Sequence, residues 1–264
     1  MLLAIDVGNS NIVLGVFDGA TLVQSWRLQT LRERTSDELG LLVEGLFAHA
    51  KIDLSRIRGV VLGSVVPPLT GTLQAMARRF FNLEPVIVDP ARNTGMPIRY
   101  ENPAEIGADR IVNAVAAYET FGRDGARPMI VVDFGTATTL DAVSAQGEYL
   151  GGAICPGVQI SADALFQRAA RLPRIDVRKP ARIVGRTTVS AMESGLFYGH
   201  VGMVEGLVRR MNDELGGNAI CIATGGLADV IAPETSLIAH VDVDLTLHGL
   251  RLVWERNQRI TAAK

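Results

Sequence analysis

The chain has 264 residues, of which 48% are hydrophobic and 20% charged, and its formal net charge is −2. This length suits one large or two modest domains with a substantial core. The nearly neutral charge argues against a general attraction to nucleic acid, and no apolar run is uninterrupted enough to cross a membrane. Because Asp6 interrupts the first apolar run, we expect no secretory signal and a cytoplasmic protein. The two cysteines are expected to be buried apolar residues, and the four histidines lack partners at zinc spacing.

The first predicted element is a β-hairpin with a polar tip. Residues 2–5 and 12–16 are apolar and β-rich, and DVGNSN at residues 6–11 is small and polar. A carboxylate, a glycine, and then amide and hydroxyl side chains suit a phosphate chain with its metal ion. The same residue types are typical of an ordinary hairpin turn, so both interpretations stand for this segment alone.

Strands and helices alternate through the rest of the first half. Apolar spacing after a third strand predicts a helix with Thr35 or Ser36 as its cap, and Pro67-Pro68 opens a second helix. The predicted elements are, in order, a strand at 21–28, a helix at 35–51, a strand within the apolar run 57–66 that ends at Ser64, a helix at 69–81, a strand at 85–88 and a helix at 104–121.

A second hairpin at residues 129–141 (MIVVDFGTATTLD) repeats the first pattern. Asp133 and Gly135 stand where Asp6 and Gly8 stood, which indicates an internal duplication. The later elements are a strand at 149–154, a helix at 158–170, an irregular basic stretch at 171–186, a helix at 189–215, a strand at 219–224, a short helix at 229–232, a strand at 237–241 and a helix at 245–258.

The stretch FGRDGARP at residues 121–128 has the composition of a linker. We therefore predict two mixed α/β domains, residues 1–122 and 123–264, that face each other across a cleft.

Other common nucleotide sites have no counterpart in this sequence. The chain has three lysines, none of which stands in the context of a P-loop, and it has no G-x-G-x-x-G segment. A protein of this sequence that handles ATP must therefore use a hairpin type of phosphate site.

Six segments spread over the chain carry a family resemblance. In order they are IDVGNSNIVLGVF, SVVPPL, GADRIVNA, DFGTATTLD, GGAICPG and TVSAMESGLFYG. This ordered set resembles the type III pantothenate kinases of the actin, sugar kinase and Hsp70 superfamily. The resemblance implies two duplicated ribonuclease H-like (actin-like ATPase) domains with an interdomain cleft. It also implies ATP-dependent phosphorylation of pantothenate, the first step of coenzyme A biosynthesis.

The resemblance assigns the nucleotide and metal residues. The nucleotide phosphates and Mg²⁺ are expected at Asp6, Val7, Gly8, Asn9, Ser10, Asn11, Ile12 and Val13, with a further nucleotide contact from Thr136. Asp133 is expected to help hold a monovalent cation, K⁺ or NH₄⁺. Gly225-Gly226 would let the backbone approach the adenosine, although a plain turn from strand to helix is the alternative.

The resemblance also places the general base at Asp109, in the GADR segment. We expect the neighbouring Arg110 to keep this carboxylate ionised and able to accept a proton. Alternatively, Asp109 is a first-turn residue that favours the helix dipole, with Arg110 in a surface ion pair.

The expected substrate residues are Tyr100, Gly107, Ala108, Asp109, Arg110 and Thr188. Arg110 suits a two-pronged contact with the pantothenate carboxylate. In the family, Thr188 reaches the pocket of the neighbouring subunit, because these enzymes are homodimers with shared sites. The apolar residues of the predicted helix that follows Thr188 suit either a core or an interface.

Two rival functions and one basic segment remain open. The rivals are a kinase of the same superfamily with another small substrate, and a non-catalytic accessory factor linked to transcription. A binding module has no need of a proton acceptor, so the presence together of Asp6, Asp109, Arg110 and Asp133 argues against the second. The basic residues between 168 and 186 suit a solvated loop first, anionic substrate capture second and nucleic acid last, since no aromatic residues interleave with them.

Overall fold

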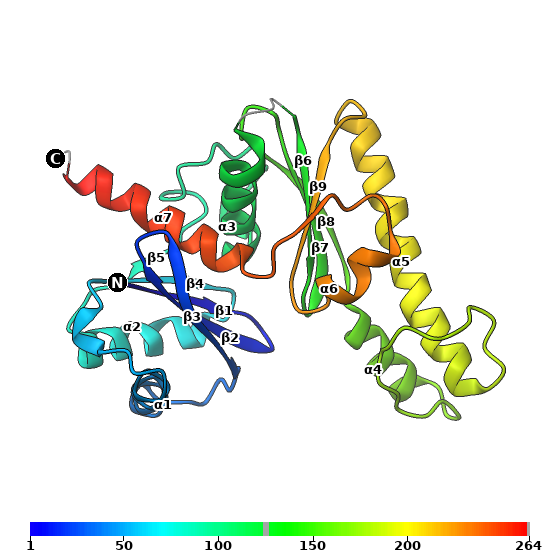
Figure 1. Cartoon of the computed structure of the whole chain (residues 1–264), viewed down its shortest axis with the longest axis horizontal. Coiled ribbons are helices and arrows are strands. Elements are labelled where there is room, and N and C mark those ends of the chain that lie inside the picture. Colours follow the sequence, from blue (N-terminus) through cyan, green and yellow to red (C-terminus); the bar gives the residue numbers. More distant parts are fainter. Residues whose placement is uncertain (124–126, 263–264) are drawn as a thin grey trace. The chain divides into compact units, whose positions relative to one another are not determined.

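A computed structural model describes residues 1–123 and 127–262 (Figure 1). The chain divides into two compact units, residues 1–116 together with 245–264, and residues 117–244. The C-terminal helix thus belongs by compactness to the first unit. The predicted boundary between residues 122 and 123 concerns the duplicated halves and stays a prediction. Part of the predicted linker, residues 124–126, lies outside the described residues.

Both units contain a five-stranded mixed sheet with the same topology. The first has the order β3-β2-β1-β4-β5, formed by Leu2–Val7 (β1), Asn11–Asp18 (β2), Thr21–Gln29 (β3), Gly59–Ser64 (β4) and Val86–Ile87 (β5). The second has the order β10-β9-β6-β7-β8, formed by Met129–Phe134 (β6), Ala137–Val143 (β7), Tyr149–Pro156 (β8), Ile220–Thr224 (β9) and His240–Val241 (β10). The first three strands of each unit are antiparallel neighbours and the last two are parallel additions. This agreement confirms the predicted duplicated α/β fold.

Strand register places the two acidic turns at equivalent points of the two sheets. Asp6 pairs with Val13 on β2 and with Gly63 on the parallel strand β4. Asp133 pairs with Thr139 on β7 and with Thr224 on the parallel strand β9. Each aspartate therefore stands near the carboxyl ends of two adjacent parallel strands, where ligands bind in sheets of this kind.

Helices cover both faces of the first sheet (Figure 1). The helices Ser36–His49 (α1) and Pro67–Phe81 (α2) contribute apolar side chains to one core. Thr35 caps α1 in a capping box with Glu38, as the sequence predicts. The helices Ala108–Ala117 (α3) and Leu245–Ala262 (α7) lie on the other side of the sheet.

The second unit builds its core between the sheet and a long helix. The helix Thr188–Glu214 (α5) packs against β6, β7 and β9, with the short helix Ala228–Ile231 (α6) beside it. The helix Val158–Arg168 (α4) contacts the first part of α5 and forms a smaller cluster there. Short helical turns complete the two units at Leu54–Arg56, Pro103–Glu105, Tyr118–Gly122 and Ala232–Glu234. None of the described helices is long and apolar enough to cross a membrane.

Two predicted elements were wrong in their extent. The helix expected at residues 104–121 begins at Ala108, because Asn102 caps a separate 3-10 turn and Ile106 has an extended backbone. It leaves the α-helical form at Ala117 for a π-helical turn, Tyr118–Gly122. The strand expected at residues 237–241 is reduced to His240–Val241.

Glycines allow α7 to lie close against its neighbours. A Cβ atom at Gly249 would stand 2.0 Å from the Val112 carbonyl oxygen of α3. Cβ atoms at Gly15 and Gly59 would meet Leu247 and Trp254 of α7 at 2.8 and 2.6 Å. The absence of side chains at these positions is what permits this packing.

We expect Gly249→Ala to destabilise the protein by about 2 kcal/mol, since the new methyl group would push against backbone atoms of α3. The matched control is Gly45→Ala in α1, where an added Cβ meets no atom within 4 Å. That change should be neutral or stabilising by up to about 1 kcal/mol, because alanine favours helices over glycine. Urea unfolding of both variants measures the difference, and equal stabilities would contradict this account of the packing.

Candidate functional site

The polar tip of the first hairpin is held by hydrogen bonds within the tip and by Thr30, the residue directly after β3. Gly8 N–H donates to the Asn11 carbonyl at 2.9 Å, which closes the turn. The Thr30 hydroxyl donates to the Gly8 carbonyl at 2.7 Å, and the Thr30 N–H donates to the Ser10 carbonyl at 3.0 Å. These bonds fix the backbone of the tip while the side chains of residues 9–11 stay exposed. The tip can therefore offer amides and polar side chains to a ligand from a rigid frame.

Two residues of the predicted phosphate segment have side chains that lie in the hydrophobic core and not at the surface of the tip. Val7 and Ile12 are 0% and 1% exposed and belong to the core of the first sheet. They can reach a ligand only through their backbone atoms. Asp6 is half-buried, at the carboxyl end of β1.

The GADR segment lies at the same edge of the first sheet as Asp6. The Val65 N–H donates to the Val7 carbonyl at 3.0 Å, which continues the pairing of β4 with β1. A Cβ at Gly63, the register partner of Asp6, would stand 3.8 Å from the Ala108 Cβ. The first unit thus brings the polar hairpin and the start of α3 to one place, as expected for groups that serve one site.

Asp109 is fitted closely into the first turn of α3. Its Oδ1 accepts the Arg110 backbone N–H at 2.8 Å. A Cβ at Gly107 would stand 2.4 Å from the same oxygen, so only glycine leaves room for this carboxylate position. Arg110 itself is 7% exposed. The pair is therefore not a surface ion pair at the end of an exposed helix.

Burial raises the pKa of the Asp109 carboxyl above its ordinary value, against the lowering effects of the Arg110 N–H and of the guanidinium charge. The lowering effect expected from Arg110 is present, but the loss of water around the carboxylate outweighs it. A raised pKa makes the carboxylate a stronger proton acceptor.

The second acidic turn lies at the edge of the other sheet. A Cβ at Gly225, whose φ is +91°, would stand 2.4 Å from Asp133 Oδ1 and 2.7 Å from the Phe134 backbone. A Cβ at Gly135 would stand 3.4 Å from the same carboxylate oxygen. The Asp133 carboxylate therefore lies between two glycines. Thr136, in the turn between β6 and β7, is exposed.

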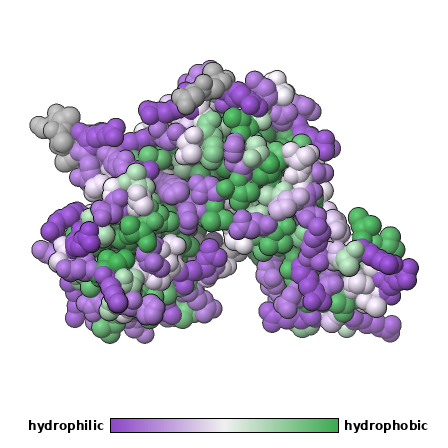
Figure 2. Space-filling model, in the orientation of Figure 1, coloured by the Kyte–Doolittle hydropathy of each residue, from purple (hydrophilic) through white to green (hydrophobic). Residues whose placement is uncertain are grey.

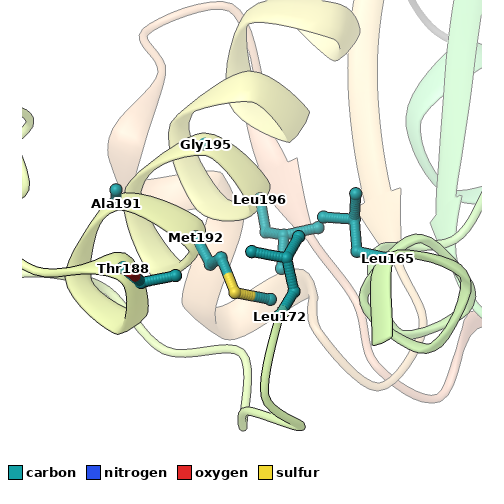
Figure 3. Close-up of a pocket in the computed structure, with 7 residues that line it drawn as sticks. All are labelled: Leu165, Leu172, Thr188, Ala191, Met192, Gly195 and Leu196. Atoms are coloured by element: carbon teal, nitrogen blue, oxygen red, sulfur yellow. The ribbon is translucent and has the colours of Figure 1, made fainter. Parts of the chain in front are cut away.

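The start of α5 lines a cavity of about 510 Å³ within the second unit (Figure 3). Its walls are Leu165, Leu172, Thr188, Ala191, Met192, Gly195 and Leu196. Figure 3 shows Met192 of α5 beside Leu172 of the segment after α4. Thr188 is thus placed at an apolar hollow, and its hydroxyl is the one side-chain polar group among these lining residues.

The basic stretch before α5 forms ion pairs with acidic residues of α5 and of a later turn. The sequence did not indicate these pairs. Arg178 Nε donates to Glu193 Oε1 of α5 at 2.7 Å, and Lys179 Nζ donates to Glu234 Oε1 at 2.7 Å. The Ser194 hydroxyl donates to the Ile183 carbonyl at 2.5 Å. Glu193 is 7% exposed, although in sequence it reads as one polar residue of a helix. In the sequence, the motif TVSAMESG as a whole was the only signal that this part of the chain has a special role, and Glu193 by itself gave none.

The basic stretch and the end of α4 before it also carry exposed apolar side chains. Ile183 and Val184 are 67% and 75% exposed, and Phe166 at the end of α4 is 46% exposed. Figure 2 shows hydrophobic atoms at the surface of this part of the second unit. Most of residues 171–186 are exposed and lie outside helices and strands, so the predicted solvated loop carries apolar as well as basic side chains.

The predicted residues divide between the two units. Tyr100, the hairpin residues and the GADR segment belong to the first unit, and Asp133, Thr136, Thr188 and Gly225 belong to the second. Among the described residues, no three His, Cys, Asp or Glu side chains gather in a group that could hold a metal ion.

Comparison with known proteins identifies the family. The family model described as type III pantothenate kinase matches residues 2–210, a range that contains every predicted site residue except Gly225 and Gly226. The chain belongs to the type III pantothenate kinase family. A type III pantothenate kinase of Moorella thermoacetica is 55% identical over 97% of this chain and 100% of the relative. One of Myxococcus xanthus is 54% identical over 97% of this chain and 99% of the relative.

Solved structures support the fold of this pantothenate kinase family member. A Baf family protein from Campylobacter jejuni aligns with a TM-score of 0.62 and 19% identity, over 97% of this chain and 99% of the other. MreB 5 of Spiroplasma citri aligns with a TM-score of 0.52 and 11% identity, over 99% and 98%. At these identities the likeness concerns the fold, which is of the actin-like ATPase type.

Proposed function

We propose that this chain transfers the γ-phosphoryl group of ATP to the primary hydroxyl of pantothenate, which gives 4′-phosphopantothenate in the first step of coenzyme A biosynthesis. The observation that carries the proposal is the similarity of 50–55% identity, over nearly the whole chain, to proteins named type III pantothenate kinase. We also propose that the reaction takes place in the cytoplasm.

Phosphoryl transfer depends on positioning and charge neutralisation. Asp6 and the rigid hairpin tip suit the nucleotide phosphates and Mg²⁺, which proteins commonly hold through one or two carboxylates together with the phosphates. The exposed Thr136 contacts the nucleotide. Asp133, whose carboxylate is bracketed by glycines, helps hold a monovalent cation, K⁺ or NH₄⁺.

Asp109 accepts the proton of the attacking hydroxyl. Its raised pKa and its fixed position in the first turn of α3 support this role. Arg110 binds the pantothenate carboxylate, with Tyr100 and the Gly107-Ala108 backbone as further contacts. Thr188 completes the pocket from the partner subunit of a homodimer.

A coupled assay with purified protein, ATP, Mg²⁺ and K⁺ tests the reaction. ADP release that depends on pantothenate, with 4′-phosphopantothenate identified by mass spectrometry, is the expected result. A parallel panel of hydroxylated acids and sugars distinguishes another small substrate of this superfamily. Nucleotide binding without turnover on any of them would instead support a non-catalytic factor.

Shared sites predict complementation between two defective variants. Asp109→Asn and Thr188→Val, co-expressed with different tags and purified through both, should form heterodimers in which one site carries both changes and the other carries neither. We expect about half of the wild-type rate at low pantothenate in this doubly purified dimer. Sites contained within single subunits would give no more than the summed rates of the two parent variants.

A further inference from the structure

Thr224 is the last residue of β9 and carries a buried side-chain hydroxyl. The residue is 1% exposed, and its Oγ1 has no hydrogen-bond partner among residues 1–123 and 127–262. Buried hydroxyl groups are nearly always paired, because each one left unpaired loses the hydrogen bonds that it made with water. A β-branched apolar residue would fill the same space without this loss. The hydroxyl therefore indicates a partner that arrives with a ligand.

Strand register puts this hydroxyl beside the second acidic turn. Asp133 and Thr224 are register partners on the adjacent parallel strands β6 and β9. The preceding pair, Val132 and Ala223, lies in the core beneath α5. Because side chains alternate along a strand, Asp133 and Thr224 both belong to the opposite face of the sheet, at its carboxyl edge.

The chemistry of this pair favours a cation. The carboxylate of Asp133 and the hydroxyl of Thr224 are both hard oxygen donors, which suit alkali and alkaline-earth ions. An anionic phosphate oxygen next to the carboxylate would be repelled unless a cation stood between them. Gly225, directly after Thr224, leaves only enough room for the Asp133 carboxylate and so keeps these oxygens in place.

We propose that Thr224 Oγ1 is a second protein oxygen, beside the Asp133 carboxylate, in the site of the monovalent cation that accompanies the nucleotide. The proposal rests on the cation role of Asp133 in the proposed function and adds a residue to it. Thr224 gives the cation a neutral oxygen, while Asp133 supplies the negative charge.

The test uses the full chain with three substitutions. Thr224→Val removes the hydroxyl and keeps the shape, and Thr224→Ser keeps the hydroxyl. Thr138→Val is the matched control, since Thr138 is also 1% exposed in the same sheet but its hydroxyl is paired with His200 Nε2 at 3.0 Å. Two measurements are made as functions of K⁺ concentration, with ionic strength held by choline chloride. One is the rate of ADP release, and the other is the unfolding temperature in the presence of ADP and Mg²⁺.

We expect Thr224→Val to raise the half-saturating K⁺ concentration at least tenfold in both measurements, and Thr224→Ser to change it by less than threefold. Thr138→Val should lower the unfolding temperature at every K⁺ concentration without moving the K⁺ midpoint. An unchanged K⁺ midpoint in Thr224→Val would overturn the proposal, as would a wild-type protein that does not respond to K⁺ in either measurement. Should Thr224→Val fail to fold, Thr224→Ala takes its place under the same criteria. The unfolding measurement does not require pantothenate turnover, so failure of the proposed reaction and failure of the cation site can be told apart.

Discussion

Asp109→Asn is expected to lower kcat by about 10²–10⁴, the usual contribution of a positioned general base. The asparagine can still accept the Arg110 N–H that Asp109 Oδ1 accepts at 2.8 Å, so the start of α3 should keep its structure. Nucleotide affinity should change little, because in the proposed function Asp109 contacts the attacking hydroxyl and the hairpin tip holds the nucleotide phosphates. Steady-state kinetics and ADP titration measure the two quantities, and a rate near that of the wild type would remove Asp109 from the role of base.

The same variant should be at least as stable as the wild type at neutral pH. Burial raises the pKa of Asp109 in the folded protein, so the folded state binds a proton more readily than the unfolded chain. The free energy of unfolding that this carboxyl contributes is present below its unfolded pKa and is lost as pH rises through the folded pKa. Asparagine never ionises and avoids this loss. A comparison of urea unfolding at pH 7.5 and at mildly acidic pH should show the gain at the higher pH and a smaller one at the lower.

Gly225→Ala should raise the KM for ATP at least tenfold and weaken the response to monovalent cations. The added Cβ would stand 2.4 Å from Asp133 Oδ1, and the φ of +91° is one that alanine adopts only with strain of about 1–2 kcal/mol. The carboxylate must therefore move, and the loop after β9 moves with it. Kinetics with ATP and K⁺ varied separately measure both effects.

Gly216→Ala separates backbone strain from crowding. Its φ is +96°, close to that of Gly225, but an added Cβ there meets no atom within 4 Å. This control should lose a similar amount of stability and leave the KM for ATP unaltered. If both variants changed the KM for ATP equally, the effect would come from backbone strain or unfolding. The close contact between position 225 and the Asp133 carboxylate would then have no influence on ATP binding.

Local sequence signals predicted most of the elements because their causes are local. The capping box of Thr35 and Glu38 involves residues three apart, and the apolar runs on both sides of each polar turn mark the strands of the two hairpins. The start of α3 was misplaced because Asn102 offers a competing cap to a separate turn. Such competition between neighbouring caps is not resolved by apolar spacing.

Features that depend on distant parts of the chain could not be predicted in this way. Lys179 pairs with Glu234, 55 residues away. The Thr224 hydroxyl lacks a hydrogen-bond partner among the described residues, which only the three-dimensional structure can show. Likewise, the pattern of α7 shows an amphipathic helix but not the sheet on which it packs. The motifs identified the residues of the candidate site, whereas the dominance of burial at Asp109 required the three-dimensional surroundings of its carboxyl.

The position of α7 affects the order in which the two units can fold during synthesis. Domains tend to fold as they emerge from the ribosome, in order from the N-terminus. Here the first sheet is formed early, but the helix that covers one of its faces begins only at Leu245. The second unit is continuous in sequence and is fully synthesised before that helix. The unit that begins first is therefore completed last, and until then the part of its sheet that α7 covers is exposed to recognition by a chaperone.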